Sequence, residues 1–325
     1  MISYFQAAVL GVLQGVTELF PISSLGHSVL VPALIGGSWK DLVTQSSTTN
    51  SQASPYLAFI VALHVGTAVA LLIFFRSDWV RIISAWFRSI GPTFKARRIV
   101  ARDSDERLAW LLVIGTIPVG ITGVLLEHTF RTLFAKPLAA AVFLTINGLI
   151  LLSGEVLRRR APVDEEDDGS TPALGNDARE ATVGRHATDG AVTTQRRTRR
   201  LVTLSYREGF LIGLFQTAAL LAGISRSGVA MVGGLARGLS HRDAARFSFL
   251  LATPVILAAG VLKLPSLTGP SASDIRGQVI VGAVLAGVAA FVSVKWLTKY
   301  FETRTLIPFA IYSLVTGIFC IIWFA

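Results

Sequence analysis

The stretch that decides the fold is Gln14 to His27, which reads QGVTELFPISSLGH. It lies inside an otherwise apolar N-terminal run, and it brings a carboxylate (Glu18), a helix-breaking Pro21 and an imidazole (His27) into that run. An ionisable side chain at membrane depth costs about 3 kcal/mol on insertion scales, so such residues usually serve a function. We therefore expect a functional site where this segment breaks.

The composition around this stretch is that of a membrane protein. The chain has 325 residues, of which 52% are hydrophobic and 15% charged, whereas soluble domains carry about 25% charged residues. Several apolar runs reach the roughly 20 residues that a helix needs to cross a bilayer. The single cysteine, Cys320, excludes a disulfide framework. We predict an all-α polytopic protein whose surroundings are the lipid bilayer.

Six apolar runs are long enough to be full spans, and two further apolar regions are interrupted. The six runs are Leu57–Phe75, Leu108–Leu126, Leu138–Leu157, Phe247–Leu264, Val279–Leu297 and Leu306–Phe324. The interrupted regions, Ala7–Ile35 and Phe210–Leu235, each break in the middle at polar residues with Pro or Gly. Neither half of such a region is long enough to cross alone, so we expect each to form a re-entrant helix-loop-helix hairpin.

The two interrupted regions are related in sequence. At a constant offset of 202, nine residues are identical: Ser3, Tyr4, Gly11, Gln14, Leu19, Ile22, Ser23, Gly26 and Gly36 match Ser205, Tyr206, Gly213, Gln216, Leu221, Ile224, Ser225, Gly228 and Gly238. Three full spans follow each hairpin, and because three is odd the second half should enter the membrane upside down. We predict two inverted repeats, residues 1–160 and 201–325, with a site near the midplane.

The distribution of arginine predicts the orientation. The net charge of +10 comes largely from polar connections between apolar runs, above all residues 76–107 and the two ends of 158–206. This is the pattern of the positive-inside rule, so these connections should be cytoplasmic, both termini should lie outside, and no nucleic-acid partner is expected. The polar insert 161–200 is predicted to be a disordered cytoplasmic linker between the repeats.

The first hairpin offers several groups that carry chemistry. Glu18 follows Gln14 by four residues, so both project from one helix face towards the break. Ser23 and Ser24 precede the second helix, and His27 lies in or near its first turn. Serine is a strong N-cap former, so either serine alone is as well explained by helix capping as by function.

The second hairpin adds an arginine between hydroxyls. Ser225, Arg226, Ser227 and Gly228 stand just before a helix, and a helix N-terminus with two hydroxyls and a guanidinium is suited to hold phosphate. The alternative is that Arg226 is a buried partner of Glu18 and only locks the hairpins together.

Two further ionisable residues lie within predicted spans. His64 is expected to be a hydrogen-bonded packing residue, with a supporting role at the site left open. Glu155 lies near the cytoplasmic end of its span and is expected to reach solvent beside Arg158.

At these residues the chain resembles the undecaprenyl-diphosphatase family, the bacterial bacitracin-resistance phosphatases. The first family signature stands here as Gln14, Glu18, Pro21, Ser23, Ser24, Gly26 and His27, and the second as Gly223, Ser225, Arg226, Ser227 and Gly228. The likeness extends to the FSFLLATP run at 247–254 and the IPFAIY run at 307–312. Two positions depart from the family pattern: Ala222 replaces a proline and Ala230 a threonine, which removes one hydroxyl that could contact phosphate.

The resemblance implies hydrolysis of undecaprenyl diphosphate to undecaprenyl phosphate and inorganic phosphate on the outer side of the bacterial cytoplasmic membrane, which recycles the carrier lipid of cell-wall synthesis. It also implies two inverted repeats with re-entrant hairpins, a divalent cation (Mg²⁺ or Ca²⁺), and a polyprenyl diphosphate as substrate. A homodimer is compatible with it.

These observations lead to a mechanistic hypothesis. Arg226, with Ser225, Ser227 and the backbone at Gly228, would hold the diphosphate. Glu18, oriented by Gln14, would hold the cation or act as general base. Ser24 is the favoured nucleophile, and His27 would shuttle the proton. Ser23 is a less favoured nucleophile and would contact the substrate. A water nucleophile activated by Glu18 or His27 stays open.

Two other classes of protein compete with this hypothesis. A transporter or lipid flippase shares the design of inverted repeats with broken helices, and it predicts binding without phosphate release. A phosphatidic-acid-type phosphatase needs a histidine shortly after its Ser-Arg pair. The nearest one here is His241, fifteen residues beyond Arg226, so the sequence excludes that class.

Overall fold

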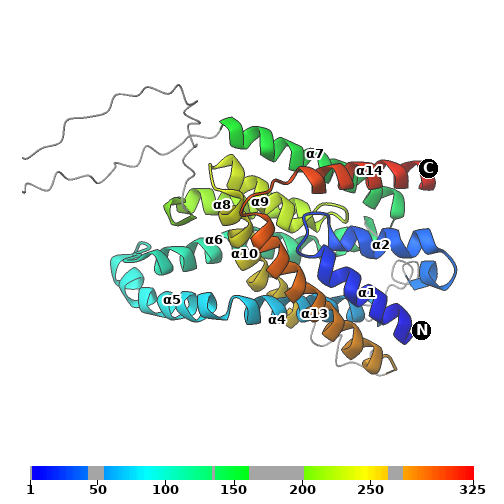
Figure 1. Cartoon of the computed structure of the whole chain (residues 1–325). Helices are drawn as coiled ribbons and strands as arrows, with labels where there is room; N and C mark the ends of the chain where they lie inside the picture. Colours follow the sequence, from blue (N-terminus) through cyan, green and yellow to red (C-terminus); the bar gives the residue numbers. More distant parts are fainter. Residues whose placement is uncertain (1, 43–54, 134–135, 161–200, 263–273) are drawn as a thin grey trace, which may run out of the picture.

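The computed structural model describes residues 2–42, 55–133, 136–160, 201–262 and 274–325 (Figure 1). The regular elements in these ranges are helices. They are α1 (Tyr4–Thr17), α2 (Ser24–Ile35), α4 (Pro55–Phe74), α5 (Arg76–Ala96), α6 (Ser104–Leu133), α7 (Pro137–Arg160), α8 (Tyr206–Phe215), α9 (Arg226–Ala236), α10 (His241–Leu262), α13 (Arg276–Tyr300) and α14 (Ile307–Phe324), with 3₁₀ turns at Leu201–Thr203 and Gln216–Leu220. The predicted linker at 161–200 lies outside the described residues.

The long apolar helices confirm an all-α polytopic membrane protein. Within the described ranges, α6, α7, α10, α13 and α14 are each long and apolar enough to cross a membrane, and α4 with α5 supplies up to a sixth span. α4, α6, α7, α10, α13 and α14 coincide with the six runs predicted as spans, to within seven residues at the ends, whereas α5 lies in the predicted connection 76–107. The chain turns by 86° between α4 and α5.

Both interrupted regions fold as a helix, a break and a second helix. The first hairpin is α1 and α2, of 14 and 12 residues, and the second is α8 and α9, of 10 and 11 residues. Each helix is shorter than the roughly 20 residues that span a bilayer. The break in the first hairpin contains Pro21, which has no N–H to continue a helix, and the break in the second contains Gly223 at φ +114°.

Two pairs of helix starts repeat the same local chemistry at the offset seen in the sequence. Ser3 and Ser205 each cap a helix through a reciprocal capping box, with Gln6 and Glu208 as the respective partners. Ser23 and Ser225 cap the second helix of each hairpin. A serine cap satisfies backbone N–H groups that the helix cannot pair itself, so it fixes where each helix begins.

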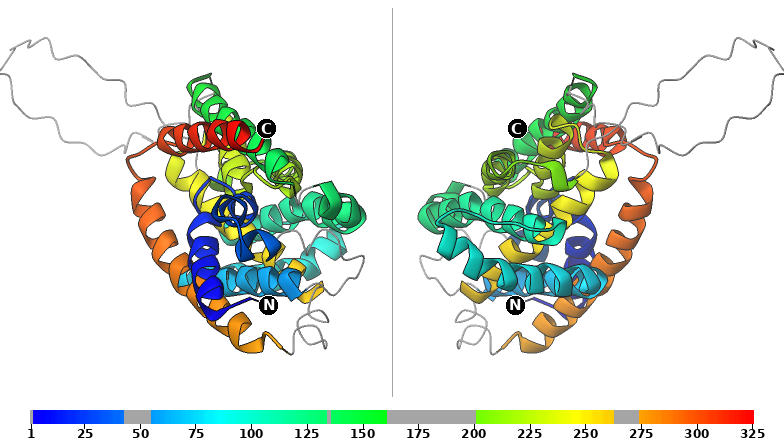
Figure 2. Two further views of the ribbon diagram at one scale, coloured as in Figure 1. Left: turned by 90° about the vertical axis from the view of Figure 1, so that its right-hand side faces the viewer. Right: turned by 90° about the vertical axis from the view of Figure 1, so that its left-hand side faces the viewer.

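The long helices hold the two hairpins against each other. α1 packs on α13, α8 packs on α6, and α9 lies between α7 and α10. α7 pairs with α14 along its length and also contacts α2 and α9, so it borders both hairpins. Figure 2 shows α13 along one side of the molecule and α6 on the opposite side. Both chain ends lie at one end of the molecule, and α5 lies at the other (Figure 1).

The contact between α1 and α13 is unusually close because two glycines face it. A Cβ added to Gly11 would meet the backbone of Gly282, and one added to Gly15 would collide with the carbonyl of Ala286. Small residues let helix backbones approach in this way inside membranes. The close approach fixes the position of the end of α1, from which Gln14 and Glu18 project.

The structure overturns the expectation for Glu155. Its side chain is not extended to solvent: the residue is 9% exposed. Its Oε1 lies 2.7 Å from Nε2 of His241 and also accepts the backbone N–H of Leu306 at 2.7 Å. A buried carboxylate needs such partners, and the sequence did not reveal them because they begin α10 and α14, far along the chain.

Candidate active site

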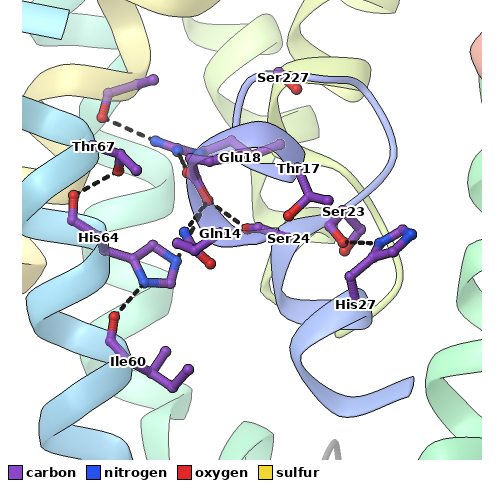
Figure 3. A network of polar contacts seen from close by, with 12 residues as sticks. Gln14, Thr17, Glu18, Ser23, Ser24, His27, Ile60, His64, Thr67 and Ser227 are labelled. Atoms are coloured by element: carbon purple, nitrogen blue, oxygen red, sulfur yellow. Dashed lines mark hydrogen bonds and ion pairs between the residues drawn. The ribbon is translucent and has the colours of Figure 1, made fainter. Parts of the chain in front are cut away.

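The carboxylate of Glu18 is the centre of the polar cluster (Figure 3). Its Oε2 accepts a hydrogen bond from Nε2 of Gln14 at 2.9 Å and another from the hydroxyl of Ser24. Its Oε1 accepts from the guanidinium of Arg226. Glu18 is only 7% exposed, so this set of donors replaces the water that an ionised carboxylate requires.

Arg226 joins the second hairpin to this carboxylate. It is the first residue of α9, and its Nη1 donates to the carbonyl of Ala252 on α10 at 2.9 Å, while Nη2 donates to Glu18. The ion pair therefore connects the breaks of the two hairpins, and Gln14, Glu18, Ser24 and Arg226 form one cluster. Both sequence interpretations of Arg226, phosphate binding and locking of the hairpins, include this contact.

Ser23 also bridges the hairpins, but through the backbone. Its Oγ accepts the N–H of Gly26 at 3.2 Å and the N–H of Gly223 at 3.1 Å. Its φ is +70°, a value that non-glycine residues adopt at a cost of about 1–3 kcal/mol. Ser23 thus caps α2 and holds the second break, and its oxygen is engaged in these two contacts.

Asn147 is a bridging residue that the sequence analysis missed. It is fully buried on α7, where Nδ2 donates to the carbonyl of Pro21 at 3.0 Å and to Oγ of Ser313 at 3.2 Å. Its Oδ1 accepts the N–H of Ser225 at 2.9 Å. The side-chain amide of Asn147 therefore hydrogen-bonds to the breaks of both hairpins. The sequence feature that could have identified Asn147 is that it places a single amide side chain in the apolar run Leu138–Leu157.

The two hydroxyls of the second break, those of Ser225 and Ser227, are engaged by other groups of the chain. Ser225 caps α9 through the N–H of Gly228 at 3.1 Å, and its Oγ lies 3.0 Å from Oγ of Ser227. Ser227 also donates to the carbonyl of Phe20 at 3.3 Å. In Figure 3 Ser227 lies apart from the Glu18 cluster. The capping interpretation accounts for Ser225 and Gly228 in this structure.

His27 lies near the cluster but points away from Glu18, with Ser23 and Ser24 between them in the view of Figure 3. Its Nδ1 donates to the carbonyl of Ser23 at 2.7 Å, and its Nε2 lies 2.8 Å from the hydroxyl of Tyr312. The imidazole also stacks on the Tyr312 ring, with centroids 5.7 Å apart. No described contact joins His27 to Glu18 or Arg226.

His64 lies closer to the carboxylate than the sequence analysis expected. Its Nδ1 donates to the carbonyl of Ile60 at 2.8 Å, and its Nε2 faces Oε2 of Glu18 at 3.5 Å. With Nδ1 committed as a donor, a proton on Nε2 makes the contact with the carboxylate attractive. His64 is therefore a member of the cluster as well as a packing residue of α4.

The residues of this cluster differ in their exposed fractions. Gln14 is fully buried, whereas the side chains of Arg226 and His64 are 15% and 26% exposed. The guanidinium of Arg226 and the imidazole of His64 are thus more exposed than the side chains of Gln14 and Glu18.

The cluster offers oxygen donors that suit a hard divalent cation only in part. Gln14 Oε1 is buried and has no hydrogen-bond partner, while Nε2 of the same amide donates to the Glu18 carboxylate. Among the described residues, no group of three His, Cys, Asp or Glu side chains could enclose a metal ion. Mg²⁺ is commonly held by one or two carboxylates together with substrate phosphates, and Glu18 would supply one such carboxylate.

The fold and this cluster together define a multi-pass helical membrane protein with a buried acid–guanidinium site between two broken hairpins. The family model described as bacitracin resistance protein BacA matches residues 7–319, so the chain belongs to that family.

Several curated relatives match along the whole chain. The chain is 58% identical over 350 residues to undecaprenyl-diphosphatase 2 of Frankia alni, which covers 100% of this chain and 98% of that relative. It is 54% identical over 325 residues to undecaprenyl-diphosphatase of Mycolicibacterium paratuberculosis, with the same coverage. Undecaprenyl-diphosphatase 2 of Burkholderia lata is 39% identical over 316 residues, or 97% of this chain and 95% of that protein.

Proposed function

We propose that the chain hydrolyses undecaprenyl diphosphate to undecaprenyl phosphate and inorganic phosphate. The names of full-length relatives at 54–58% identity support this reaction. The observation that carries the proposal in the molecule itself is the cluster of Glu18, Ser24 and Arg226, because it combines a base, a hydroxyl and a cation for phosphate.

Arg226 is assigned to the diphosphate. Its guanidinium is held at one end by the Ala252 carbonyl, so it is pre-oriented, and a fixed guanidinium matches the geometry of phosphate oxygens. Phosphoryl transfer spreads negative charge over the transferred group. A positive group that is already in place stabilises this charge without reorganising.

Ser24 is assigned as the nucleophile because its hydroxyl is the one that donates to Glu18 among the described contacts. Glu18 takes the hydroxyl proton as Oγ bonds to the terminal phosphorus, and the anhydride P–O bond breaks to release undecaprenyl phosphate. Water then attacks the phosphoserine, which frees inorganic phosphate and restores the hydroxyl. Direct attack by water activated by Glu18 is the alternative route to the same products.

A divalent cation fits beside these groups. Glu18 and the unpartnered Oε1 of Gln14 would hold it, and the diphosphate would complete its coordination. When bound, Mg²⁺ or Ca²⁺ supplies charge neutralisation at the phosphates. His64 is placed to orient Glu18, and His27, engaged by Tyr312, would need to rotate in order to shuttle a proton to the site.

The two halves are assigned as inverted repeats, with the site opening to the outer side of the bacterial cytoplasmic membrane. Matching capping boxes and serine caps at one constant offset support the repeat. α1 begins beside the amino terminus, and α8 begins towards the opposite end of the molecule (Figure 1). The prenyl tail would lie in lipid between the helices.

The reaction is tested by phosphate release from undecaprenyl diphosphate by the purified protein in detergent. Release that depends on added Mg²⁺ or Ca²⁺ and stops with a chelator is the expected result. Saturable binding of the lipid without any phosphate release, with or without the cations, would instead support a transport function.

A further inference from the structure

Four large apolar side chains of α5 are exposed on one side of the helix. The exposed fractions are 67% for Val80, 48% for Ile83, 64% for Phe87 and 82% for Phe94. The helix is held to the rest of the molecule by its other side, where Ile82, Ala85 and Ser89 are buried. The exposed side is therefore a continuous apolar stripe on a fixed helix.

A row of basic residues follows this stripe along the whole helix. Val80, Phe87 and Phe94 recur every seven residues, and each is followed directly by a basic residue: Arg81, Arg88 and Lys95. Seven residues are close to two helical turns, so each set stays on one line of the helix surface. The apolar line and the basic line run side by side, about 100° apart around the helix axis. Helices that lie in the membrane interface have such an apolar side next to a basic side.

The position of α5 in the fold agrees with such a location. α5 turns by 86° away from α4, so an α4 that crosses the membrane close to its normal directs α5 along the surface. α5 lies at the end of the molecule opposite both termini (Figure 1), which is the end that the arginine distribution predicts to be cytoplasmic.

We propose that α5 lies flat in the cytoplasmic interface of the membrane and binds anionic lipid. Val80, Ile83, Phe87 and Phe94 enter the boundary between headgroups and acyl chains. Arg81 and Arg88 each pair with a carboxylate of this chain, Asp78 and Asp103 respectively, but their side chains are 56% and 57% exposed. Their remaining N–H groups, together with Lys95, contact anionic headgroups of the cytoplasmic leaflet. A second copy of the chain fits less well, because a symmetric contact through this side would set the basic row of one copy against the basic row of the other.

The depth of α5 is measured on the full-length protein in bilayers of phosphatidylcholine and phosphatidylglycerol. Nitroxide labels are attached to Phe87→Cys, Phe94→Cys and Ala96→Cys in a Cys320→Ala background, since Ala96 is exposed on the opposite side of the same helix. Collisions with oxygen should exceed collisions with a water-soluble nickel complex at positions 87 and 94, with the reverse at 96. Higher nickel accessibility at 87 and 94, or dipolar broadening between two labelled copies, overturns the proposal.

The role of the basic row is tested separately with spin-labelled phosphatidylglycerol and phosphatidylcholine. The variant Arg81→Gln/Arg88→Gln/Lys95→Gln should lose at least half of the preference for phosphatidylglycerol. The matched control Lys295→Gln/Lys299→Gln/Arg304→Gln removes three exposed positive charges near the end of α13 and should lose less than half as much. Equal losses in the two variants would show a general charge effect and contradict specific binding at α5.

Discussion

Arg226 donates a hydrogen bond to the carboxylate of Glu18, 208 residues away in the sequence, and so joins the breaks of the two hairpins. Each residue sits where its hairpin changes direction, so the pair depends on both hairpins being in place. A buried ion pair contributes little net stability by itself, but leaving one of its charges unpaired is costly. The pair can therefore serve the reaction and the fold together, and these two roles can be separated.

A double-mutant cycle makes this separation. Glu18→Ala and Arg226→Ala should each lower the free energy of unfolding by about 3–5 kcal/mol because each leaves a buried charge without its partner. The double variant should be less destabilised than the sum of the two, while phosphate release stays lost in all three. Thermal unfolding and phosphate release are measured on the same preparations. If hydrolysis returns in the double variant together with stability, the pair is only a lock.

The two adjacent serines should respond differently to substitution. Ser24→Ala removes the hydroxyl next to Glu18 and should lower kcat at least about 100-fold with little change in stability. Ser23→Ala removes the cap of α2 and the contact with Gly223, so it should cost about 0.5–2 kcal/mol of stability. Acid-quenched reactions of the unsubstituted protein should contain phosphoserine at position 24. Normal turnover by Ser24→Ala would assign the attack to water.

Asn147 should be important for stability, although it is absent from the proposed chemistry. Asn147→Leu keeps a similar volume but leaves the carbonyl of Pro21 and the N–H of Ser225 without partners, and each unsatisfied buried group costs about 1–3 kcal/mol. The unfolding temperature should fall clearly. Thr145→Val, on the same helix, serves as the control, because the described hydrogen bond of its hydroxyl stays within α7, at the carbonyl of Ala141. Equal unfolding temperatures for the two variants would contradict the bridging role.

The sequence predicted the helices and the interrupted regions well because hydropathy and helix breakers are local signals. Pro21 ends α1 by its own chemistry, and the constant offset of 202 identified the corresponding break at Gly223. The partners of Glu155, His64 and Asn147 depend on how distant helices pack, and a single sequence does not contain that information. The orientation of the His27 ring towards Tyr312 is a tertiary contact of the same kind.

Cation binding should depend on the diphosphate. Because Gln14 and Glu18 supply two side chains with oxygen donors, Mn²⁺ followed by electron paramagnetic resonance should bind weakly to the protein alone and more tightly with a non-hydrolysable polyprenyl diphosphate analogue. Gln14→Glu adds a carboxylate and should tighten binding without the analogue, whereas Gln14→Leu should weaken it in both cases. Binding that is unchanged in both variants would place the cation elsewhere.

The most direct measurement is inorganic phosphate released from undecaprenyl diphosphate by the unsubstituted protein, Arg226→Ala and Arg226→Lys, each purified in the same detergent and shown to be folded by its unfolding temperature. The unsubstituted protein should release phosphate with multiple turnovers. Arg226→Ala should be at least about 100-fold slower, and Arg226→Lys, which keeps the charge but loses the planar fork, should fall between the two. Equal rates for all three proteins would contradict the central claim that the ion pair across the hairpins is the phosphate site.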